Sequence, residues 1–307
     1  MSKASIITAA YNGEKFITET LDSLLNQSEK DIELIVIDSE STDKTTRIIE
    51  SHKDKRIKYF SHQNTGSPVA PRNKGLQEAA GVLIGFCDQD DLYYPEKINK
   101  QVQAYENSQE REKVGIIICS ADLIDEKGNK IGQNPVPRDG YIDHTTAHDL
   151  LLSCNFITAC SALVPKKILD EVGSLDESLR GVDDYDLWLR VTEKYGILAL
   201  KEPLCAWRQS DVSLSADKTK QYIETEKIFI KLGDSETERI GHGKNLTRIF
   251  LSCVLNKDFV MAKEYCDKAK KFPLSTKINF LIKLFNVSHS FSYYVFVLLR
   301  KMGRISL

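Results

Sequence analysis

Four polar residues, Asp88, Gln89, Asp90 and Asp91, directly follow a run of apolar and small residues at 82–87. A run of this length predicts a strand that is buried on both faces. Carboxylates crowded at the end of such a strand repel one another, and burying them without a positive partner costs free energy. Their oxygen atoms suit Mg²⁺ or Mn²⁺, so Asp88 and Asp90 are predicted metal ligands; the alternative is a solvated polar turn.

A second acid, Asp38, closes another apolar run at 32–38. In open α/β sheets the ligand binds beyond the carboxyl ends of the strands. Asp38 and Asp88 are therefore expected to face one site although they are far apart in the sequence. A divalent ion at this site would bridge to a phosphate and offset the charge of a departing diphosphate.

Strands and helices must bring these acids together. Helical periodicity alternates with apolar runs that predict strands at 4–8, 32–38, 56–60, 82–87 and 114–121. Ser41 or Thr42 is the expected N-cap of the helix that follows the second run. The alternation predicts an α/β fold with a mixed, mainly parallel sheet and helices on both faces.

The pattern is less regular from 120 to 155. Beyond it we expect a strand at 155–165, a short helix at 166–173, an acidic-headed helix at 183–196 and a strand at 197–210. Asp183 and Asp184 begin the acidic-headed helix, where the macrodipole stabilises negative charge. The remainder is mostly helical in pattern and rich in lysine, which predicts a helical extension over 216–307.

The 307 residues are 41% hydrophobic and 28% charged, with a net charge of −2. This is ordinary globular composition and gives no case for nucleic-acid binding. The seven cysteines include no CxxC pair, so neither a zinc knuckle nor a disulfide framework is expected. The N-terminus lacks a signal-like region and no apolar run is long enough to span a bilayer, so we expect a cytoplasmic protein.

Four longer motifs occur in order: SIITAAYNGEKFITETLDSLLNQS, ELIVIDSESTDKT, NTGSPVAPRNKGLQEAAGVLIGFCDQDD and GVDDYDLWLRV. Together they resemble the inverting family 2 glycosyltransferases with the GT-A fold, over residues 3–210. The resemblance implies a GT-A catalytic domain at 1–215, followed by the extension at 216–307. Within the domain, 1–119 would bind the nucleotide sugar and 120–215 the acceptor.

The resemblance also implies roles for single residues. The nucleotide sugar would be held by Ala9, Ala10, Tyr11, Asn12, Glu14, Asp38, Arg72, Asn73, Asp88 and Gln89. Asp184 would be the catalytic base, and Asp88 and Asp90 would hold Mg²⁺ or Mn²⁺. The acceptor side would include Asp91, Asp183, Trp188 and Arg208. The simpler alternatives are that Tyr11 packs under a loop, Arg72 pairs with a helix neighbour and Trp188 belongs to the core.

Several positions depart from the family pattern. Ser39 stands where a second Asp is common and Glu40 where Gly is usual, which leaves the choice of nucleotide open. The family often has a His at the position of Ser210, where it helps to bind metal or diphosphate. Arg208, two residues earlier, is expected to compensate in part by contacting phosphate.

The C-terminal segment has eight basic residues and no acidic residue after Asp267. Lys277 and Lys283 flank one apolar helical face, made of Ile278, Leu281, Ile282 and Phe285. This arrangement resembles an element that lies on an anionic membrane surface. The alternative is a helix packed on the catalytic domain or on a second copy of the chain, which would form a homodimer.

These features predict an enzyme that transfers a sugar, with inversion, from a UDP-linked donor to a glycan or polyprenyl-linked acceptor. By family analogy the setting is bacterial surface-polysaccharide assembly at the inner face of the plasma membrane. One alternative is a sugar nucleotidyltransferase, although the stretch AAYNGEKF lacks the Gly-rich phosphate loop of that class. Another is a degenerate sugar-binding scaffold, prompted by Ser39 and the missing His.

Overall fold

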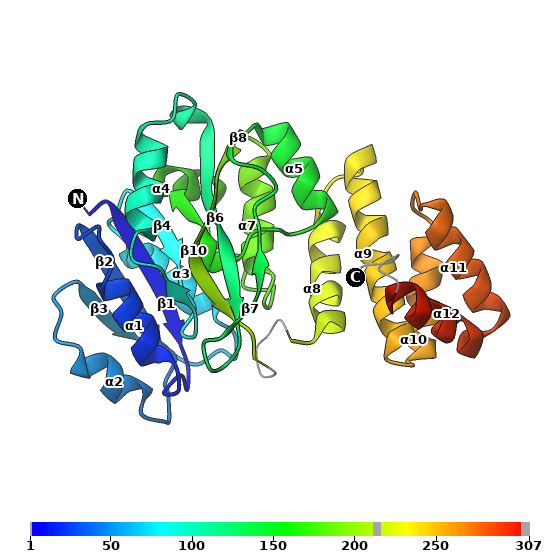
Figure 1. Ribbon diagram of the computed structural model, residues 1–307, viewed down its shortest axis with the longest axis horizontal. Coiled ribbons are helices and arrows are strands. Elements are labelled where there is room, and N and C mark those ends of the chain that lie inside the picture. Colours follow the sequence, from blue (N-terminus) through cyan, green and yellow to red (C-terminus); the bar gives the residue numbers. More distant parts are fainter. Residues whose placement is uncertain (1, 211–215, 302–307) are drawn as a thin grey trace. The chain divides into compact units, whose positions relative to one another are not determined.

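The computed structural model describes residues 2–210 and 216–301, and it divides into two compact units (Figure 1). The first unit precedes residues 211–215, and the second follows them and includes residues 152–154. Each unit has a hydrophobic cluster of its own. The boundary expected at 215, and residues 302–307 of the expected extension, lie outside the described residues.

The first unit is built on one mixed sheet with the strand order β3-β2-β1-β4-β9-β6-β10-β5. Two further strands pair at its side, β7 with β6 and β8 with β10. The strands are β1 (Ala4–Ala10), β2 (Ile32–Asp38), β3 (Ile57–Ser61), β4 (Leu83–Phe86), β5 (Leu92–Tyr93), β6 (Val114–Ile124), β7 (Lys130–Asn134), β8 (Gly140–Ile142), β9 (Leu163–Pro165) and β10 (Gly196–Arg208). The longer ladders are parallel and the short ones antiparallel, so the predicted mainly parallel sheet is confirmed.

The order of the strands decides where the helices lie. The chain steps from β1 to β2 to β3 and then returns to β4 on the other side of β1. Because crossovers between parallel strands are right-handed, α3 must cover the opposite face from α1 and α2. The helices are α1 (Ile17–Leu25), α2 (Thr45–Ser51), α3 (Val69–Glu78), α4 (Lys97–Glu106), α5 (His144–Ser153), α6 (Lys166–Val172) and α7 (Asp183–Thr192). The reversal makes the carboxyl ends of β1 and β4 the switch point at which such sheets bind ligands.

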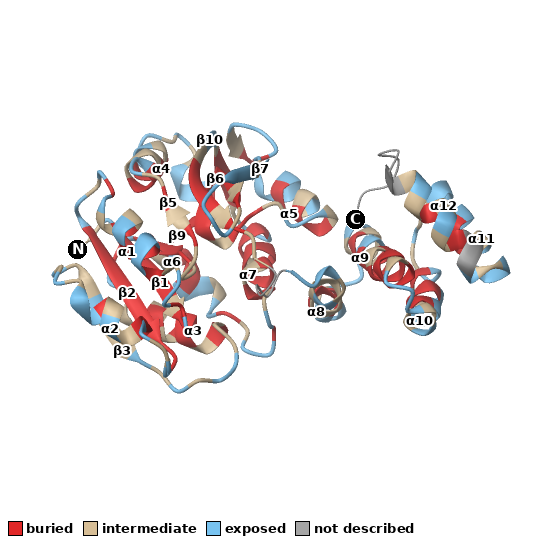
Figure 2. Cartoon of the chain, turned by 60° about the horizontal axis from the view of Figure 1, so that its bottom comes forward, coloured by how far each residue is buried: buried red, intermediate tan, exposed pale blue. Residues whose placement is uncertain are grey.

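The core of the first unit follows the apolar runs of the sequence. All seven residues of β2 are buried, as predicted for a strand covered on both faces (Figure 2). Burying one Leu or Ile side chain stabilises a fold by about 1.5–3 kcal/mol. A close approach of α3 to β1 depends on Gly75, since a Cβ there would lie 2.4 Å from Ile7 Cγ2.

The second unit is helical, which confirms the predicted C-terminal helical extension. Its helices are α8 (Lys218–Lys231), α9 (Glu236–Leu255), α10 (Phe259–Ala269), α11 (Thr276–Val287) and α12 (His289–Lys301). The apolar face predicted for a membrane surface is buried in this unit's own core: Leu281, Ile282 and Phe285 are at most 4% exposed, and Ile278 packs beside them. That assignment of the face is therefore wrong.

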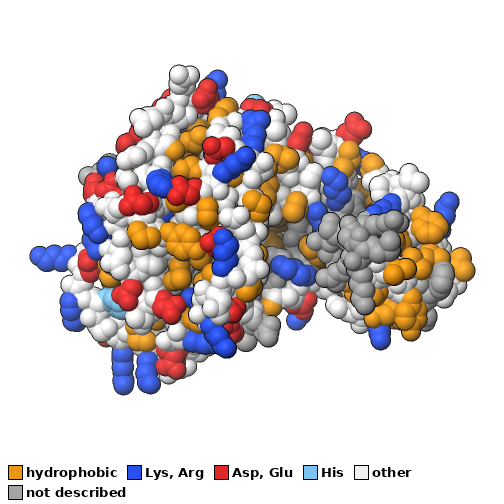
Figure 3. Space-filling view, viewed as in Figure 1, with side chains coloured by type: hydrophobic (Ala, Val, Ile, Leu, Met, Phe, Trp, Pro, Cys, Tyr) orange, Lys and Arg blue, Asp and Glu red, His pale blue; other side chains and the backbone are white. Residues whose placement is uncertain are grey.

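A different face of α11 and α12 is exposed. The outward apolar side chains are Phe280, Val287, Tyr294 and Leu298, and hydrophobic side chains gather over α10–α12 in Figure 3. Within residues 2–210 and 216–301, no helix combines the length and the apolar character needed to cross a bilayer.

Three local predictions are wrong. Helix α2 begins at Thr45 without a side-chain cap. Both predicted caps lie in the loop before it, where Ser41 Oγ donates to Asp38 Oδ1 at 2.5 Å and Thr42 Oγ1 donates to Asn12 Oδ1 at 3.3 Å. The strand expected at 155–165 is reduced to β9, preceded by a short 3₁₀ turn at Ala159–Ser161. Helix α5 lies in a stretch for which no helix is predicted.

Candidate active site

Arg72 joins two acidic groups that are far apart in the sequence. It lies on α3 and donates from Nη2 to Asp88 Oδ1 at 2.5 Å and from Nη1 to Asp183 Oδ2 at 2.7 Å. Asp88 follows β4, whereas Asp183 begins α7. Burial lowers the pKa of Arg72, but Asp88 and Asp183 together outweigh that effect and the net shift is upward. The protein itself thus supplies the positive partner that the acidic turn requires.

Asp184 sits beside this ion-paired group in the first turn of α7. Burial raises the pKa of its carboxyl, and the charge of Asp183 raises it further, while Arg72 opposes both. The result is a pKa of about 7. A carboxylate with this pKa can exchange a proton with an alcohol-bearing ligand near neutral pH. Asp183 differs, because one oxygen pairs with Arg72 and the other, Oδ1, is buried with no partner among the described residues.

Asp90 and Asp91 crowd the turn after β4. Burial raises the pKa of Asp90 to about 6, and the neighbouring charge of Asp88 adds to the shift. Asp91 is 2% exposed, and burial raises the pKa of its carboxyl well above the usual range. Its Oδ1 accepts a hydrogen bond from the backbone N–H of Arg208 at 3.0 Å. Asp91 is thus enclosed by the protein, and the Asp88–Asp90 pair is the part of the turn that reaches the surface.

Gln89 fastens this turn to the loop after β1. Its Oε1 accepts from the backbone N–H of Tyr11 at 2.9 Å, and its Nε2 donates to the Tyr11 carbonyl at 3.1 Å. The Gln89 carbonyl accepts from Thr20 Oγ1 at 2.9 Å. The side chain of Gln89 is therefore occupied by the protein, while Tyr11 is 46% exposed and does not pack under a loop.

The loops after β1 and β2 are fastened to each other. Asn12, at a left-handed φ of 47°, donates from its backbone to Ser41 Oγ and accepts at Oδ1 from the Thr42 N–H. Glu14 Oε2 accepts from the backbone N–H of Lys44 at 3.0 Å. Asn12 and Glu14 thus shape the expected nucleotide-binding edge by holding two loops together.

Asp38 lies at the end of β2 and is paired in register with Ala10 at the end of β1. Ala9 is the residue before Ala10 on β1. Its carboxylate accepts from Ser41 N and Oγ, Thr46 Oγ1 and Tyr59 OH at 2.5–3.4 Å. With β1 between β2 and β4, Asp38 and Asp88 flank the same strand end. Asp38 is 2% exposed, so it anchors the loop after β2 instead of offering a free carboxylate.

Two further predicted residues lie inside the unit. The amide of Asn73 donates to the Leu175 carbonyl and to Glu177, and it accepts from the Leu175 N–H. Trp188 is fully buried, and its Nε1 has no partner among the described residues. This burial matches the alternative in which Trp188 belongs to the core, because a side chain with no exposed surface cannot contact the acceptor substrate.

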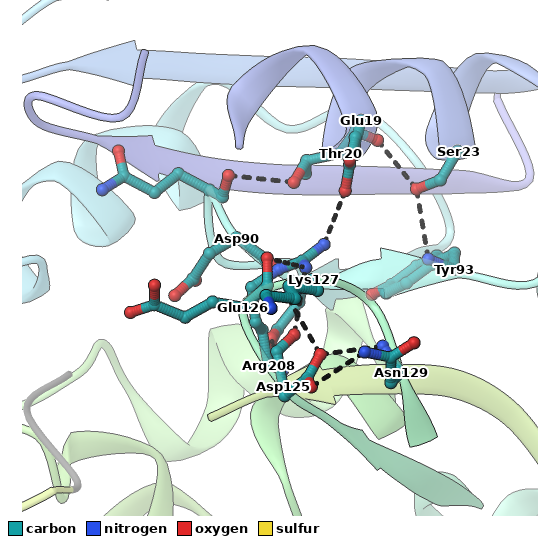
Figure 4. A network of polar contacts seen from close by, with 12 residues as sticks. Glu19, Thr20, Ser23, Asp90, Tyr93, Asp125, Glu126, Lys127, Asn129 and Arg208 are labelled. Carbon is teal, nitrogen blue, oxygen red and sulfur yellow. Dashed lines mark hydrogen bonds and ion pairs between the residues drawn. The ribbon is translucent and has the colours of Figure 1, made fainter. Parts of the chain in front are cut away.

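Arg208 is enclosed as well (Figure 4). It is 1% exposed, and its Nη2 donates to Glu19 Oε2 at 2.6 Å while Nε donates to the Asp90 carbonyl at 2.8 Å. Glu19 was not among the predicted site residues. No sequence signal could have found it, because its contact with Arg208 joins positions that are 189 residues apart.

The family model for glycosyl transferase family 2 matches residues 5–173. That span is more than half of the chain. The chain belongs to glycosyl transferase family 2. The predicted resemblance and the enzyme class are thereby confirmed.

Relatives of this glycosyltransferase carry the same class of name. An uncharacterized glycosyltransferase of Rickettsia typhi is 33% identical over 226 residues, which cover 73% of this chain and 70% of that protein. A protein of Escherichia coli named UDP-Glc:alpha-D-GlcNAc-diphosphoundecaprenol beta-1,3-glucosyltransferase WfaP is 34% identical, covering 78% of this chain and 90% of its own. Other Rickettsia relatives are longer, and the chain spans between 27% and 57% of their length.

Solved structures share the fold of this glycosyltransferase. Staphylococcus aureus TarS 1–349 in complex with UDP-GlcNAc has a TM-score of 0.72 at 18% identity, covering 99% of this chain and 93% of that one. A mannosyltransferase of Pyrobaculum calidifontis in complex with GDP-Man and Mn²⁺ has a TM-score of 0.59 at 16% identity, covering 99% and 88%. At these identities the likeness shows the fold.

The donor set of the glycosyltransferase fits a hard divalent cation. Among the described residues, no group of three or more His, Cys, Asp and Glu side chains is arranged to hold a metal. Mg²⁺ in such enzymes typically takes one or two carboxylates and completes its shell with phosphate oxygens and water. Asp88 and Asp90 offer two carboxylates in one turn, and burial together with the charge of Asp88 raises the pKa of Asp90, a shift that a bound cation would oppose.

Proposed function

We propose that this glycosyltransferase transfers a sugar from a UDP-linked donor to a lipid-linked glycan acceptor with inversion. The observation that carries the proposal is the double ion pair of Arg72, which holds Asp88 and Asp183 at one point. A leaving diphosphate beside Asp88 would then face a base at Asp184. The names of the WfaP relative and of the TarS complex, with a UDP-sugar in both and a diphosphoundecaprenol acceptor in the first, support the choice of substrates.

The proposed reaction is a single displacement. The oxygen of the acceptor hydroxyl attacks the anomeric carbon while Asp184 accepts the proton of that hydroxyl. The bond between the sugar and the diphosphate breaks on the opposite face. No sugar–enzyme bond is required, in contrast to two-step retaining chemistry. Asp183 is fully buried, so we infer that it acts through its ion pair with Arg72 and through its charge beside Asp184.

The chain prepares the leaving-group side in two ways. Asp88 and Asp90 would hold Mg²⁺ or Mn²⁺, which when bound offsets the charge of the departing diphosphate. Gln89 holds the backbone of Tyr11, whose exposed ring is available to stack on the base of the nucleotide.

The direct test is to incubate the protein with a panel of UDP-sugars, each with Mn²⁺ or Mg²⁺, and a diphosphoundecaprenol-linked acceptor. Proton NMR of the product should show the anomeric configuration inverted. Asp184→Asn should lower kcat by about 10²–10⁴-fold, as expected when a general base is removed. Asp90→Ala or chelation with EDTA should lower both transfer and the slow hydrolysis of the UDP-sugar.

The same assay separates the rival functions. Formation of a UDP-sugar from UTP and a sugar phosphate would identify a nucleotidyltransferase. Binding of a sugar with no turnover of any nucleotide sugar would identify a scaffold. A product with retained configuration would overturn the single displacement while leaving the enzyme class intact.

We also propose that the second unit attaches the enzyme to an anionic membrane surface. The attaching face would be the exposed one on α11 and α12, not the predicted face that is buried. It combines Lys277 and Lys283 with four apolar residues, Phe280, Val287, Tyr294 and Leu298. A face with this composition suits an anionic lipid surface better than a second copy, because a symmetric dimer would place like charges against each other.

Vesicle sedimentation tests the attachment. Wild type should bind vesicles that contain phosphatidylglycerol and release them at high salt. Replacing Phe280, Val287, Tyr294 and Leu298 by Ser should abolish binding, whereas the control substitutions Val82→Ser and Ile131→Ser, both at exposed positions of the first unit, should not. Equal binding of both variants would disprove the attachment, and a dimer that the Ser variant loses would identify a second copy as the occupant.

A further inference from the structure

Arg208 makes the most widely spread polar contacts around the candidate site. It ends β10, where the register pairs it with Ile124 of β6. Its side chain contacts α1, the acidic turn after β4 and the turn between β6 and β7 (Figure 4). These three segments are remote in the sequence, and the Arg208 side chain joins all of them.

All three nitrogens of the Arg208 guanidinium donate to the protein, and the side chain is 1% exposed. Nε donates to the Asp90 carbonyl at 2.8 Å, Nη1 to the carbonyls of Asp125 and Glu126 at 3.3 Å each, and Nη2 to Glu19 at 2.6 Å. The guanidinium carbon also lies 4.5 Å from the centre of the Phe16 ring. A contact with phosphate would require Arg208 to leave these groups, and carbonyls that lose a donor in a buried place cost free energy.

Every residue of the acidic turn is held by a residue from another part of the chain. Asp88 is held by Arg72, and Gln89 is held by the backbone of Tyr11. The carbonyl of Asp90 and the carboxylate of Asp91 are both held by Arg208, the first through Nε and the second through the backbone N–H. The peptide between Asp90 and Asp91 is held at both of its polar groups: the carbonyl accepts from Arg208 Nε, and the N–H donates to the Asp88 carbonyl at 3.1 Å. Of these two partners, Arg208 is the one that lies outside the turn.

We propose that Arg208 is a positioning residue for metal binding and that it does not contact phosphate. It fixes the peptide of Asp90, and thereby the direction of the Asp90 carboxylate, while Glu19 holds the guanidinium in place. The inference rests on the proposed function, because it takes Asp88 and Asp90 as the metal ligands. Removing a group that orients metal ligands typically weakens metal affinity by about 10–100-fold.

Two binding measurements test this role without relying on turnover. The first is the affinity for Mn²⁺ in the presence of UDP, followed by the loss of the free-ion electron paramagnetic resonance signal. The second is the affinity for UDP without metal, followed by calorimetry. Arg208→Met should weaken Mn²⁺ binding by about tenfold or more and change metal-free UDP affinity less than about twofold.

Glu19→Gln is the companion variant, because the Glu19 carboxylate accepts from Arg208 Nη2, and no other side-chain hydrogen bond of Glu19 is found within residues 2–210 and 216–301. It should weaken Mn²⁺ binding in the same direction by a smaller factor, and the double variant should bind Mn²⁺ no worse than Arg208→Met alone. This variant also keeps the proposal testable where Arg208→Met does not fold, since the Glu19 side chain is 60% exposed.

Arg190→Met is the matched control. Arg190 likewise pairs with one carboxylate, Asp186 at 2.8 Å, and donates to backbone carbonyls, but on α7 and the loop at 172–174. It should lower the melting temperature without changing Mn²⁺ affinity. An equal loss of Mn²⁺ affinity in this control would reduce the role of Arg208 to general stability.

The outcomes keep the two proposals apart. A loss of metal-free UDP affinity in Arg208→Met, with unchanged Mn²⁺ affinity, would show a phosphate contact and overturn the positioning role. Unchanged binding of both ligands in Arg208→Met and Glu19→Gln would overturn it too. If the wild type bound neither UDP nor Mn²⁺, the proposed function itself would fail.

Discussion

At the scale of single residues, the pKa of Asp184, the proposed base, should set the pH dependence of the reaction. The proposed base must be ionised, and its pKa is about 7. We therefore expect kcat/KM to fall about tenfold per pH unit below that value and to level off above it. Asp183→Asn removes a negative charge that raises the pKa of Asp184. It also frees Arg72, whose positive charge lowers that pKa, so the kcat/KM profile should move to lower pH. A profile that moves the other way, or stays in place, would contradict the assignment of Asp184 as the base.

Gly13 allows a second prediction at this scale. A Cβ at Gly13 would lie 2.3 Å from Gln89 Oε1, so Gly13→Ala should displace the Gln89 amide from the backbone of Tyr11. Two neutral hydrogen bonds are together worth about 1–3 kcal/mol, so the KM for the UDP-sugar should rise about tenfold. Gly132→Ala is the control, since its Cβ would meet its nearest neighbour at 3.4 Å, an ordinary contact. If both variants kept the wild-type KM, the link between Gln89 and Tyr11 would have no part in donor binding.

At the scale of elements, the sequence predicted the strands and helices that have a clear hydrophobic pattern. The bounds of β2 agree with the apolar run at 32–38, because a strand covered on both faces needs apolar residues throughout. Helix α5 was missed, although Asp143 precedes it and caps the Thr146 N–H and although Ala147 and Leu151 are four residues apart and buried. The cap and the spacing of these apolar residues are visible in the sequence, but the surrounding segment has no regular pattern, so the helix was not predicted.

The acidic residues of the candidate site could be predicted from the sequence, but the side chains that pair with them could not. Asp88, Asp90 and Asp184 follow from strand ends and a motif, which are local features. The ion pairs of Arg72 join residues 16 and 111 positions away, and such pairings depend on the strand order. The same holds for Arg208, for which the sequence predicted a phosphate contact and the structure has contacts with the protein. Long-range polar contacts leave no periodic trace in a sequence.

Helix α9 offers a prediction at the element scale. Ser235 caps it in a capping box: Ser235 Oγ accepts from the Glu238 N–H, and Glu238 accepts from the Ser235 N–H. Ser235→Ala should therefore destabilise the second unit by about 1 kcal/mol, measured by urea titration of the helical circular dichroism signal. Glu238→Gln keeps an acceptor at the same place and should cost less. Equal stability of Ser235→Ala and wild type would mean that another group replaces the cap.

At the scale of the whole molecule, the two units should unfold separately. Each unit buries a hydrophobic cluster of its own, and regions with separate cores can open as separate cooperative units. Both tryptophans, Trp188 and Trp207, belong to the first unit, so tryptophan fluorescence reports on that unit alone. Circular dichroism reports on both units, because both contain helices. A difference between the two melting curves is the expected sign of independent units.

His242 should make the second unit lose stability in acid. Its ring lies between Phe229 and Phe272, at 5.6 and 4.5 Å between ring centres, and its Nε2 is buried with no partner among the described residues. Burial lowers the pKa of His242 below 6.5; Glu226 opposes that shift and Lys268 adds to it. The unfolded state then binds the proton more readily, so stability is complete above pH 6.5 and is lost as the pH falls.

The measurement compares melting temperatures between pH 7 and pH 5 for the wild type and for His242→Phe. Acidification should lower the melting temperature followed by circular dichroism more in the wild type than in the variant. In His242→Phe a Phe ring occupies the place of the imidazole and cannot bind a proton. The fluorescence transition of the first unit should respond to pH alike in both proteins. Parallel pH dependence of the circular dichroism curves would show that His242 is not the acid-sensitive group. A fluorescence transition that follows the substitution would show instead that the two units unfold as one.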